Sequence, residues 1–249
     1  MLKEERFQKL LSILETSQFV TVKDLSDKLC VSMPTVRRDL GELASQNRVL
    51  RSHGGAMRLN DKRITTPVDF RRSVNAKEKA SIAKEAAKFI HDNAVIFVDA
   101  STTAAYLADY YEGFRNLILV TNSLMTAVHL KNMGIRTYFL GGEVISSSIA
   151  VGGRISTDAA RNFNIDIMFF SSYGINEDGV IVDTSEEENE LRRYVLRHTG
   201  TSVFLCDKSK FGKNSVFNLA SLNEVDYMIT NGKVPNNYPS TKIKTILVG

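Results

Sequence analysis

The chain has 249 residues, of which 43% are hydrophobic and 24% charged, and its net charge is +4. A chain of this length can bury a sizeable core and favours two domains over one. Cys30 and Cys206 are its only cysteines and no CxxC spacing occurs, which favours a reduced cytoplasmic protein without a metal site. No stretch approaches the roughly 20 apolar residues of a membrane helix, and no signal-peptide pattern is present.

Positive charge is concentrated in the N-terminal part of the chain. Residues 1–72 contain 14 Lys or Arg against 9 Asp or Glu, whereas residues 73–249 contain 18 against 19. Such an excess favours a polyanionic partner for the N-terminal part. A few surplus charges are also common on a solvated surface, so charge alone leaves both interpretations open.

The first predicted elements form a helix-turn-helix. An amphipathic helix is expected over residues 3–16, because its apolar side chains share one face. A short helix begins near Val22, and Cys30 and Val31 form the turn that follows it. Two helices joined by so short a turn indicate a helix-turn-helix motif over about residues 20–39.

The helix after this turn is the predicted recognition helix. Ser32 is a candidate N-cap, and Pro34 falls in the first turn, where a missing N–H costs little. From Val36 onward, apolar residues repeat at i, i+4 and i+7 and form an inward stripe. The opposite face suits a helix whose N-terminal end enters a major groove. Its DNA-facing candidates are Ser32, Thr35, Arg37 and Arg38.

Two strands are predicted after the recognition helix, over residues 49–52 and 56–59, joined by the turn His53-Gly54-Gly55. They form a two-stranded wing, in which Arg51 and His53 are candidates to contact phosphate or the adjacent minor groove. For His53, a turn histidine bonded to the backbone remains an open alternative.

The stretches VSMPTVRRDLGEL and RSHGGA resemble the N-terminal signature of the DeoR family of bacterial transcriptional regulators. A helix-turn-helix pattern by itself has many false positives, but this core combined with a His-Gly-Gly wing is more specific. The resemblance implies a winged helix that binds double-stranded operator DNA, usually as a repressor. We expect Asp39 to orient an arginine or to face the domain, because phosphate would repel its carboxylate.

Residues 60–75 are polar and without periodicity, so we predict a linker there, with Phe70, Arg71 and Arg72 docked on the second domain. From residue 76, strands alternate with helices, which indicates an α/β fold with a mostly parallel sheet covered on both faces. Helices are predicted over residues 77–91, from the Ser101–Thr103 loop through Tyr110, and over residues 124–133. Strands are predicted over residues 94–98, 117–120, 136–140, 167–170, 202–206, 227–230 and 244–248.

Ligands of such sheets bind in the loops at the carboxyl ends of the strands. Four of these loops are polar here: residues 99–103, 121–123, 141–143 and 207–210. They offer hydroxyls at a helix start, an amide, a Gly-Gly pair for close backbone approach, a carboxylate and lysines, which together suit a small phosphorylated polyol. Ordinary helix capping explains the polar residues of any one loop. The occurrence of four such loops at the same edge of the sheet favours a ligand-binding site.

Residues 76–232 resemble the DeoR C-terminal sensor domain, which is similar in fold to ribose-phosphate isomerase and glucosamine-phosphate deaminase. The resemblance implies a phosphorylated sugar effector, without cofactor, metal or catalytic residue. Carried over by position, the effector-binding candidates are Asp99, Ser101, Thr102, Thr103, Asn122, Gly141, Gly142, Glu143, Gly174, Glu188, Lys208 and Lys210.

Three positions depart from the family pattern. Ser101 replaces a glycine, Tyr173 replaces an asparagine, and Lys208 stands where histidine is usual. We therefore expect an effector outside the family's common set.

The sequence thus predicts a winged helix-turn-helix domain over residues 1–59, a linker over 60–75 and a sensor and oligomerisation domain over 76–249. The expected function is repression of a carbohydrate-metabolism operon, by a homodimer or homotetramer, because one recognition helix contacts only a half-site. One alternative is a sugar-phosphate isomerase or deaminase with a DNA-binding appendage, in which the carboxylates and lysines of the loops act as acids and bases. A purely architectural DNA-binding protein is another, but it leaves the polar loops without a role.

Overall fold

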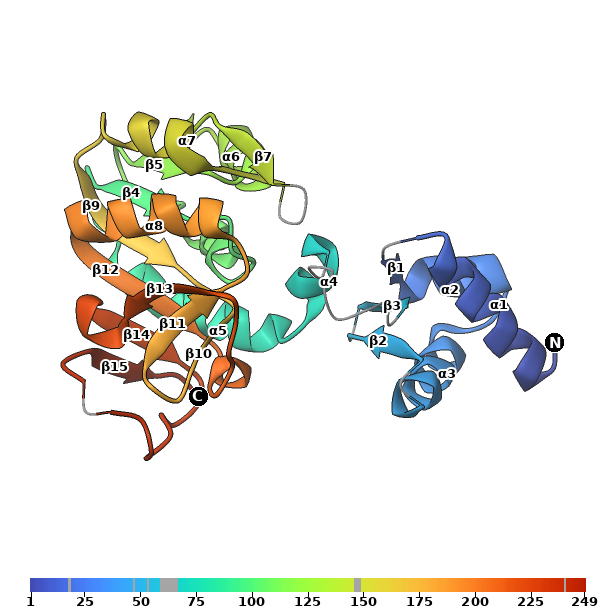
Figure 1. Ribbon diagram of the computed structural model, residues 1–249. Helices are drawn as coiled ribbons and strands as arrows, with labels where there is room; N and C mark the ends of the chain where they lie inside the picture. Colours follow the sequence, from blue (N-terminus) through green and yellow to red (C-terminus); the bar gives the residue numbers. More distant parts are fainter. Residues whose placement is uncertain (18, 47, 53, 59–66, 146–148, 240) are drawn as a thin grey trace. The chain divides into compact units, whose positions relative to one another are not determined.

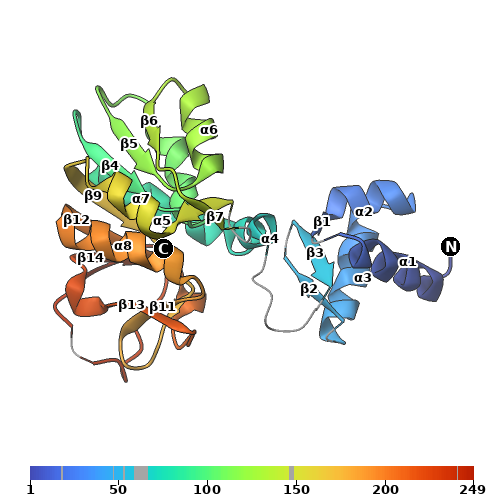
Figure 2. The same ribbon diagram turned by 45° about the horizontal axis from the view of Figure 1, so that its top comes forward.

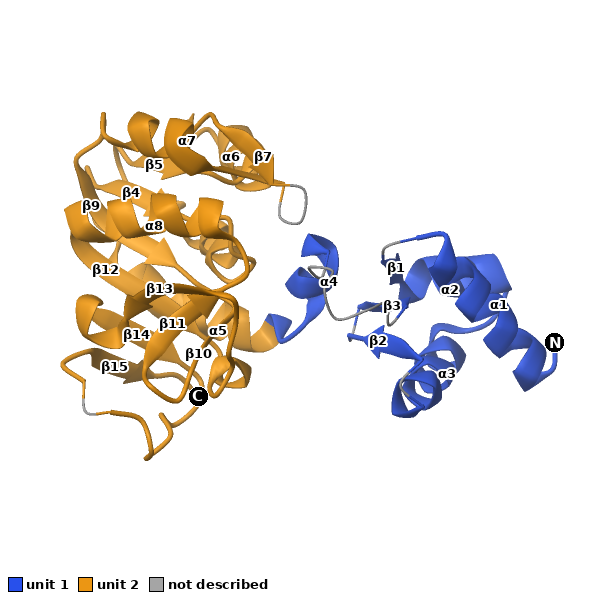
Figure 3. Ribbon diagram, viewed as in Figure 1, with its two compact units in different colours: residues 1–76 blue, residues 77–249 orange. Residues whose placement is uncertain are grey.

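The computed structural model describes the whole chain except residues 18, 47, 53, 59–66, 146–148 and 240. Contacts divide it into two compact units, Met1–Ala76 and Lys77–Gly249 (Figure 3). Among the described residues, no helix has both the length and the apolar character needed to cross a membrane.

The first unit is the predicted winged helix-turn-helix. Three helices pack their apolar stripes into one core, in which Leu10, Leu25 and Leu40 are fully buried. The wing is antiparallel and gains an unexpected strand, so that the order is β1-β3-β2 (Figure 1). The elements are α1 (Lys3–Glu15), β1 (Val20–Thr21), α2 (Val22–Leu29), α3 (Met33–Ser45), β2 (Val49–Arg51) and β3 (Gly55–Arg58).

Local caps set the helix-turn-helix geometry. Ser32 accepts a hydrogen bond from the Thr35 N–H at 3.4 Å, which confirms the predicted N-cap of α3. Cys30 ends α2 in the left-handed conformation, with φ of 52°, and it is exposed. A connection of three residues, from Cys30 to Ser32, therefore joins α2 to α3.

The predicted linker contains a helix, α4 (Val68–Ser73), which packs within the first unit. Phe70 is buried, and its ring lies edge-on against Phe19 with the centroids 5.7 Å apart. The Ser73 hydroxyl also lies 2.6 Å from that of Ser52. The prediction that Phe70 docks on the second domain is therefore wrong. Its partner is an aromatic ring 51 positions earlier, which periodicity within residues 60–75 does not reveal.

The second unit contains the predicted parallel sheet. Its seven strands have the order β15-β14-β12-β9-β4-β5-β6, and every neighbouring pair is parallel. The strands are β4 (Val95–Val98), β5 (Ile118–Thr121), β6 (Arg136–Phe139), β9 (Ile165–Phe170), β12 (Thr199–Cys206), β14 (Tyr227–Thr230) and β15 (Lys244–Leu247). All seven predicted strands are thus confirmed within a few residues at each end.

Alternate side chains of these strands enter two cores, one on each face. Ile96 and Val98 belong to one core, whereas Phe97 between them belongs to the other. The first core is closed by α5 (Ala76–Ala86), the 3-10 helix η2 (Ala104–Tyr110) and α6 (Leu124–Asn132). The second is closed by α7 (Gly153–Ala160) and α8 (Glu186–His198), and α8 crosses that face in both views (Figures 1 and 2).

Several elements differ from the prediction. The expected helix through Tyr110 is the 3-10 helix η2, which turns with bonds such as Tyr106 N–H to the Thr103 carbonyl. The helix expected to reach His91 ends at Ala86 and is followed by η1 (Ala87–Phe89). Several short antiparallel strands and two 3-10 helices were not expected. They are β7 (Glu143–Ile145), β8 (Ala150–Gly152), β10 (Gly174–Ile175), β11 (Val180–Asp183), η3 (Lys208–Lys210), β13 (Phe217–Ser221) and η4 (Leu222–Glu224).

Candidate functional site

Helix α3 presents the predicted DNA-facing side chains on its outer side. Arg37 and Arg38 are exposed, whereas Val36 next to them is fully buried. The hydroxyls of Ser32 and Thr35 lie 2.9 Å apart at the N-terminal end of the helix. Two cations and two hydroxyls therefore share one end of α3, as phosphate and base contacts require.

Asp39, which directly follows these arginines, faces inward. Only 1% of it is exposed, and it pairs with Arg6 of α1, whose Nη2 lies 3.1 Å from Asp39 Oδ1. The expectation that Asp39 orients an arginine is confirmed, and its partner is Arg6. This buried pair fixes α3 on α1 and leaves Arg38 outside.

The wing places Arg51 beside the recognition helix. Arg51 is exposed on β2, and a Cβ added to Gly41 of α3 would lie 3.1 Å from its Nη1. The guanidinium thus lies against α3 and extends the same cationic surface. The other wing candidate, His53, lies outside the described residues.

In the second unit, the carboxyl ends of the neighbouring strands β4, β9 and β12 bring polar side chains together. Asp99, after β4, accepts hydrogen bonds from the N–H groups of Ser101 at 3.1 Å and Ser171 at 3.2 Å. Lys210, after β12, donates to the Ser171 hydroxyl at 2.6 Å and to the Ser172 carbonyl. The structure therefore joins three predicted site residues: Ser101 bonds Asp99 directly, and Ser171 connects Asp99 to Lys210.

A buried arginine of α8 lies at the centre of this edge. Arg192 places Nη1 2.6 Å from Asp183 and Nη2 2.6 Å from Glu188, and its Nε lies 3.2 Å from Asp99 Oδ2. Glu188 was predicted, but Arg192 and Asp183 were missed. The spacing of Glu188 and Arg192 at i, i+4 was a signal for the ion pair, although not for its burial.

Burial and pairing act in opposite directions on these groups. Burial raises the pKa of Asp99, and the attraction of Arg192 offsets this only in part. Burial also opposes ionisation of Asp183, but Arg192, with a contribution from Lys210, holds the pKa of this carboxyl below its ordinary value. Burial by itself would lower the pKa of Arg192, yet the three carboxylates outweigh it and raise that pKa. Asp183 and Arg192 are therefore a firmly ionised pair.

Besides Arg192 Nε, which has only its ion pair with Asp99, three buried polar atoms at this edge have no hydrogen-bond partner among the described residues. They are Thr103 Oγ1 after β4, Asn122 Oδ1 after β5 and Asn189 Nδ2 on α8. The other amide atom of Asn122, Nδ2, donates to the Val151 carbonyl at 3.0 Å, so this side chain is held in place. Because buried polar groups almost always have partners, these atoms have capacity for a hydrogen bond with a water molecule or a ligand.

Lys79 of α5 also reaches this edge, and the sequence analysis missed it. Only 4% of Lys79 is exposed, and its Nζ lies 3.1 Å from Thr102 Oγ1. A signal was available, because Lys79 precedes Ile82 and Ala86 at i+3 and i+7 on the inner stripe of the helix.

Other predicted site residues have different roles in the structure. Glu143 begins β7, is exposed, and makes no side-chain hydrogen bond or ion pair with described residues. Lys208 is exposed, and its backbone N–H donates to Asn231. The structure thus does not join either side chain to the Arg192 cluster.

The predicted glycines allow close packing of the chain. Gly142 has φ of +148°, and a Cβ there would lie 2.2 Å from Ser156 Oγ of α7, while Gly141 accepts a bond from the same hydroxyl. A Cβ at Gly174 would lie 2.2 Å from Lys213 Cβ. The sequence predicted that the Gly-Gly pair approaches a ligand, but the close approach here is to α7.

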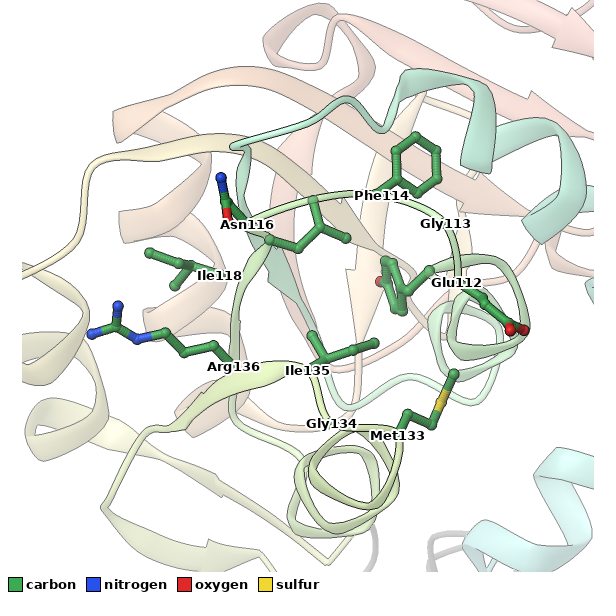
Figure 4. A pocket seen from close by; sticks show the side chains of 11 residues that line it. Glu112, Gly113, Phe114, Asn116, Ile118, Met133, Gly134, Ile135 and Arg136 are labelled. Carbon is green, nitrogen blue, oxygen red and sulfur yellow. The ribbon is translucent and has the colours of Figure 1, made fainter.

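A separate cavity of about 790 Å³ lies at the opposite, amino end of the sheet (Figure 4). It is bordered by the first residues of β5 and β6, Ile118 and Arg136, and it includes the buried Tyr111. It therefore has no part in the polar edge around Asp99. Among the described residues, no group of three His, Cys, Asp or Glu is arranged to hold a metal ion.

Comparison with known families agrees with both units. Residues 6–62 match the DeoR-like helix-turn-helix domain, and residues 74–232 match the DeoR C terminal sensor domain. The chain belongs to the DeoR family. It is a DNA-binding transcriptional regulator with a sensor domain, so the predicted family and fold class are confirmed.

Full-length relatives of this DeoR-family chain are regulators. The HTH-type transcriptional regulator GolR of Listeria innocua is 34% identical over 231 residues, which cover 92% of this chain and 91% of the relative. The glycerol-3-phosphate regulon repressor of Escherichia coli is 30% identical and covers 94% and 93%. The L-fucose operon activator of Haemophilus influenzae is 31% identical and covers 87% of each chain.

Among solved structures, ribose 5-phosphate isomerase A of Methanocaldococcus jannaschii aligns with 55% of this chain and 55% of its own. The TM-score is 0.42 and the identity 19%. A likeness of that size carries no argument about function.

Proposed function

We propose that α3 and the wing bind operator DNA, and that the polar edge around Asp99 binds a phosphorylated sugar that changes this binding. The observation that carries the effector site is the set of three buried, unpartnered polar atoms, on Thr103, Asn122 and Asn189, beside the Arg192 cluster. The names of relatives, which include regulators of glycerol-3-phosphate and fucose genes, support a sugar-related effector.

The chemistry of the edge fits the two parts of such a ligand. The half-exposed ammonium of Lys210 and the hydroxyls of residues 101–103 suit a phosphate, because bonds to a charged acceptor are shorter and stronger. The amides of Asn122 and Asn189 suit sugar hydroxyls, which both donate and accept. We keep Gly141, Gly142 and Gly174 as supports of the loops, and Glu143 and Lys208 as contacts at the rim.

Binding without turnover is the better interpretation of the carboxylates. Asp99 and Glu188 are both paired with Arg192, and Glu143 is exposed at the start of β7. A general base must be free to accept a proton within hydrogen-bond reach of the substrate. The proposal therefore assigns these groups to ligand binding and to the support of Arg192, and assigns no catalysis to this domain.

The DNA-binding part of the proposal rests on Arg37, Arg38 and Arg51, which are exposed on or beside α3. One recognition helix spans one half-site, so we propose a homodimer or homotetramer that represses a carbohydrate-metabolism operon from the cytoplasm.

Thermal denaturation of the full chain with a set of sugar phosphates, neutral sugars and inorganic phosphate tests the effector site. A ligand that binds only the folded state raises the midpoint as its concentration increases. We expect a shift with at least one sugar phosphate, and its loss in the double variant Thr102→Ala, Lys210→Ala. Lys131→Ala, an exposed lysine in the last turn of α6, is the matched control. An unchanged shift in the double variant would place the phosphate elsewhere.

A further inference from the structure

Lys79 is a cation inside the second unit, in contact with the loop that follows β4. Its side chain is nearly inaccessible, and Nζ lies 3.1 Å from the Thr102 hydroxyl. Thr103, next in the chain, has a buried hydroxyl without a partner among described residues. Asp99 holds the same loop in place, because its carboxylate accepts a hydrogen bond from the Ser101 N–H. An ammonium and an unused hydroxyl therefore converge on one short loop.

The position of Lys79 along the chain is equally informative. Helix α5 begins at Ala76, the last residue of the DNA-binding unit, so Lys79 lies three residues beyond the boundary. Ile82, Ala83 and Ala86 of the same helix are fully buried in the core, whereas Lys77 in its first turn is exposed. Lys79 is thus the first buried residue of α5, where its packed part meets the turn that continues into the DNA-binding unit.

We propose that Lys79 is the residue through which an occupied effector site acts on α5, and thereby on the DNA-binding unit. This inference rests on the proposed function and identifies how the same site is coupled to DNA. One hydrogen bond of the Lys79 ammonium goes to the neutral Thr102 hydroxyl, at 3.1 Å. A phosphate on this loop replaces that acceptor with an anionic oxygen, so the bond then joins two opposite charges and is shorter and stronger.

The exchange of acceptor has different consequences at the two ends of the side chain. At the loop, it adds one cation to the phosphate contacts of Lys210. At α5, it draws the Lys79 backbone toward the anion, and with it the first turn of the helix, which includes the exposed Lys77. Coupling between two sites amounts typically to about 5–150-fold in affinity, and an effector whose contacts differ between two arrangements of this turn produces it.

The test uses the full-length protein, its selected operator DNA, and the sugar phosphate with the largest thermal shift. Lys79→Met keeps the length and apolar stem of the side chain but removes the charge. Lys84→Met, on an exposed position of the same helix, is the control. Sugar-phosphate affinity is measured by calorimetry, and operator affinity by fluorescence anisotropy without ligand and at a concentration that saturates each variant.

We expect wild type and Lys84→Met to change operator affinity at least tenfold on saturation. Lys79→Met should bind the sugar phosphate more weakly and, even when saturated, change operator affinity less than twofold. A full response of saturated Lys79→Met would overturn the inference, because Lys79 would then be only a ligand contact. Lys79→Gln supplies the same comparison if the methionine variant does not fold. Failure of wild type to respond to any sugar phosphate would refute the proposed function itself, and the inference with it.

Discussion

Replacement of Arg192 by methionine is the strongest test of the buried cluster. The change removes the cation that joins Asp99, Asp183 and Glu188, of which at most 9% is exposed. Removing one partner of a buried ion pair costs about 3–5 kcal/mol, because the remaining charge is left without compensation in a low-dielectric site. For a domain of this size, each kcal/mol lowers the unfolding midpoint by about 2–4 °C, so we expect a fall of roughly 6–20 °C.

The pH dependence of this loss provides a second criterion. In wild type the pKa of Asp183 is lowered, so its stabilising effect is present above the ordinary carboxyl pKa and is lost as the pH falls through the lowered value. The raised pKa of Asp99 acts in the opposite sense, so its contribution is present in acid and is lost as the pH rises. Without Arg192 the carboxylates protonate more readily, and the deficit of the variant should shrink from pH 7.5 to pH 5.

Urea denaturation followed by circular dichroism measures both effects, since the chain has no tryptophan for fluorescence. Arg197→Met, an exposed arginine on the same helix, is the matched control and should leave the free energy of unfolding nearly unchanged. If Arg192→Met stays within about 1 kcal/mol of wild type at pH 7.5, or its deficit grows in acid, the cluster does not have the energetic role argued from its burial.

Three further outcomes are expected. Arg38→Ala should cost about 1–3 kcal/mol on the operator and less on random DNA in salt-titrated anisotropy, whereas equal losses would assign Arg38 to phosphate. Gly55→Ala should destabilise the first unit by about 1–3 kcal/mol in thermal denaturation, because its Cβ would lie 2.3 Å from the Val20 carbonyl oxygen and 2.6 Å from the Phe19 ring. An unchanged midpoint would show that these groups move apart freely. Product analysis should detect no isomerase or deaminase turnover of sugar phosphates, and turnover that disappears in Glu143→Gln would contradict the proposed absence of catalysis.

Local rules were sufficient for the helix-turn-helix, for the two predicted wing strands and for the seven strands of the parallel sheet. The N-cap at Ser32 and the tolerance of Pro34 depend on atoms within a single turn, so the start of α3 follows from four consecutive residues. The strands are short apolar runs with alternate side chains in two cores, and such runs are recognisable without knowing their neighbours. Once the end of a strand is predicted, the polar loop that comes after it is predicted as well.

What only the tertiary structure decided is which of these loops share a site. Asp99 and Arg192 are 93 positions apart, and they meet because α8 packs over the face of a sheet in which β4, β9 and β12 are adjacent. Strand order depends on long-range packing, which the periodicity of a single segment does not encode. Lys79 was missed for the same reason. The sequence shows its position on the helix, but its contact with Thr102 forms only when α5 packs on the sheet.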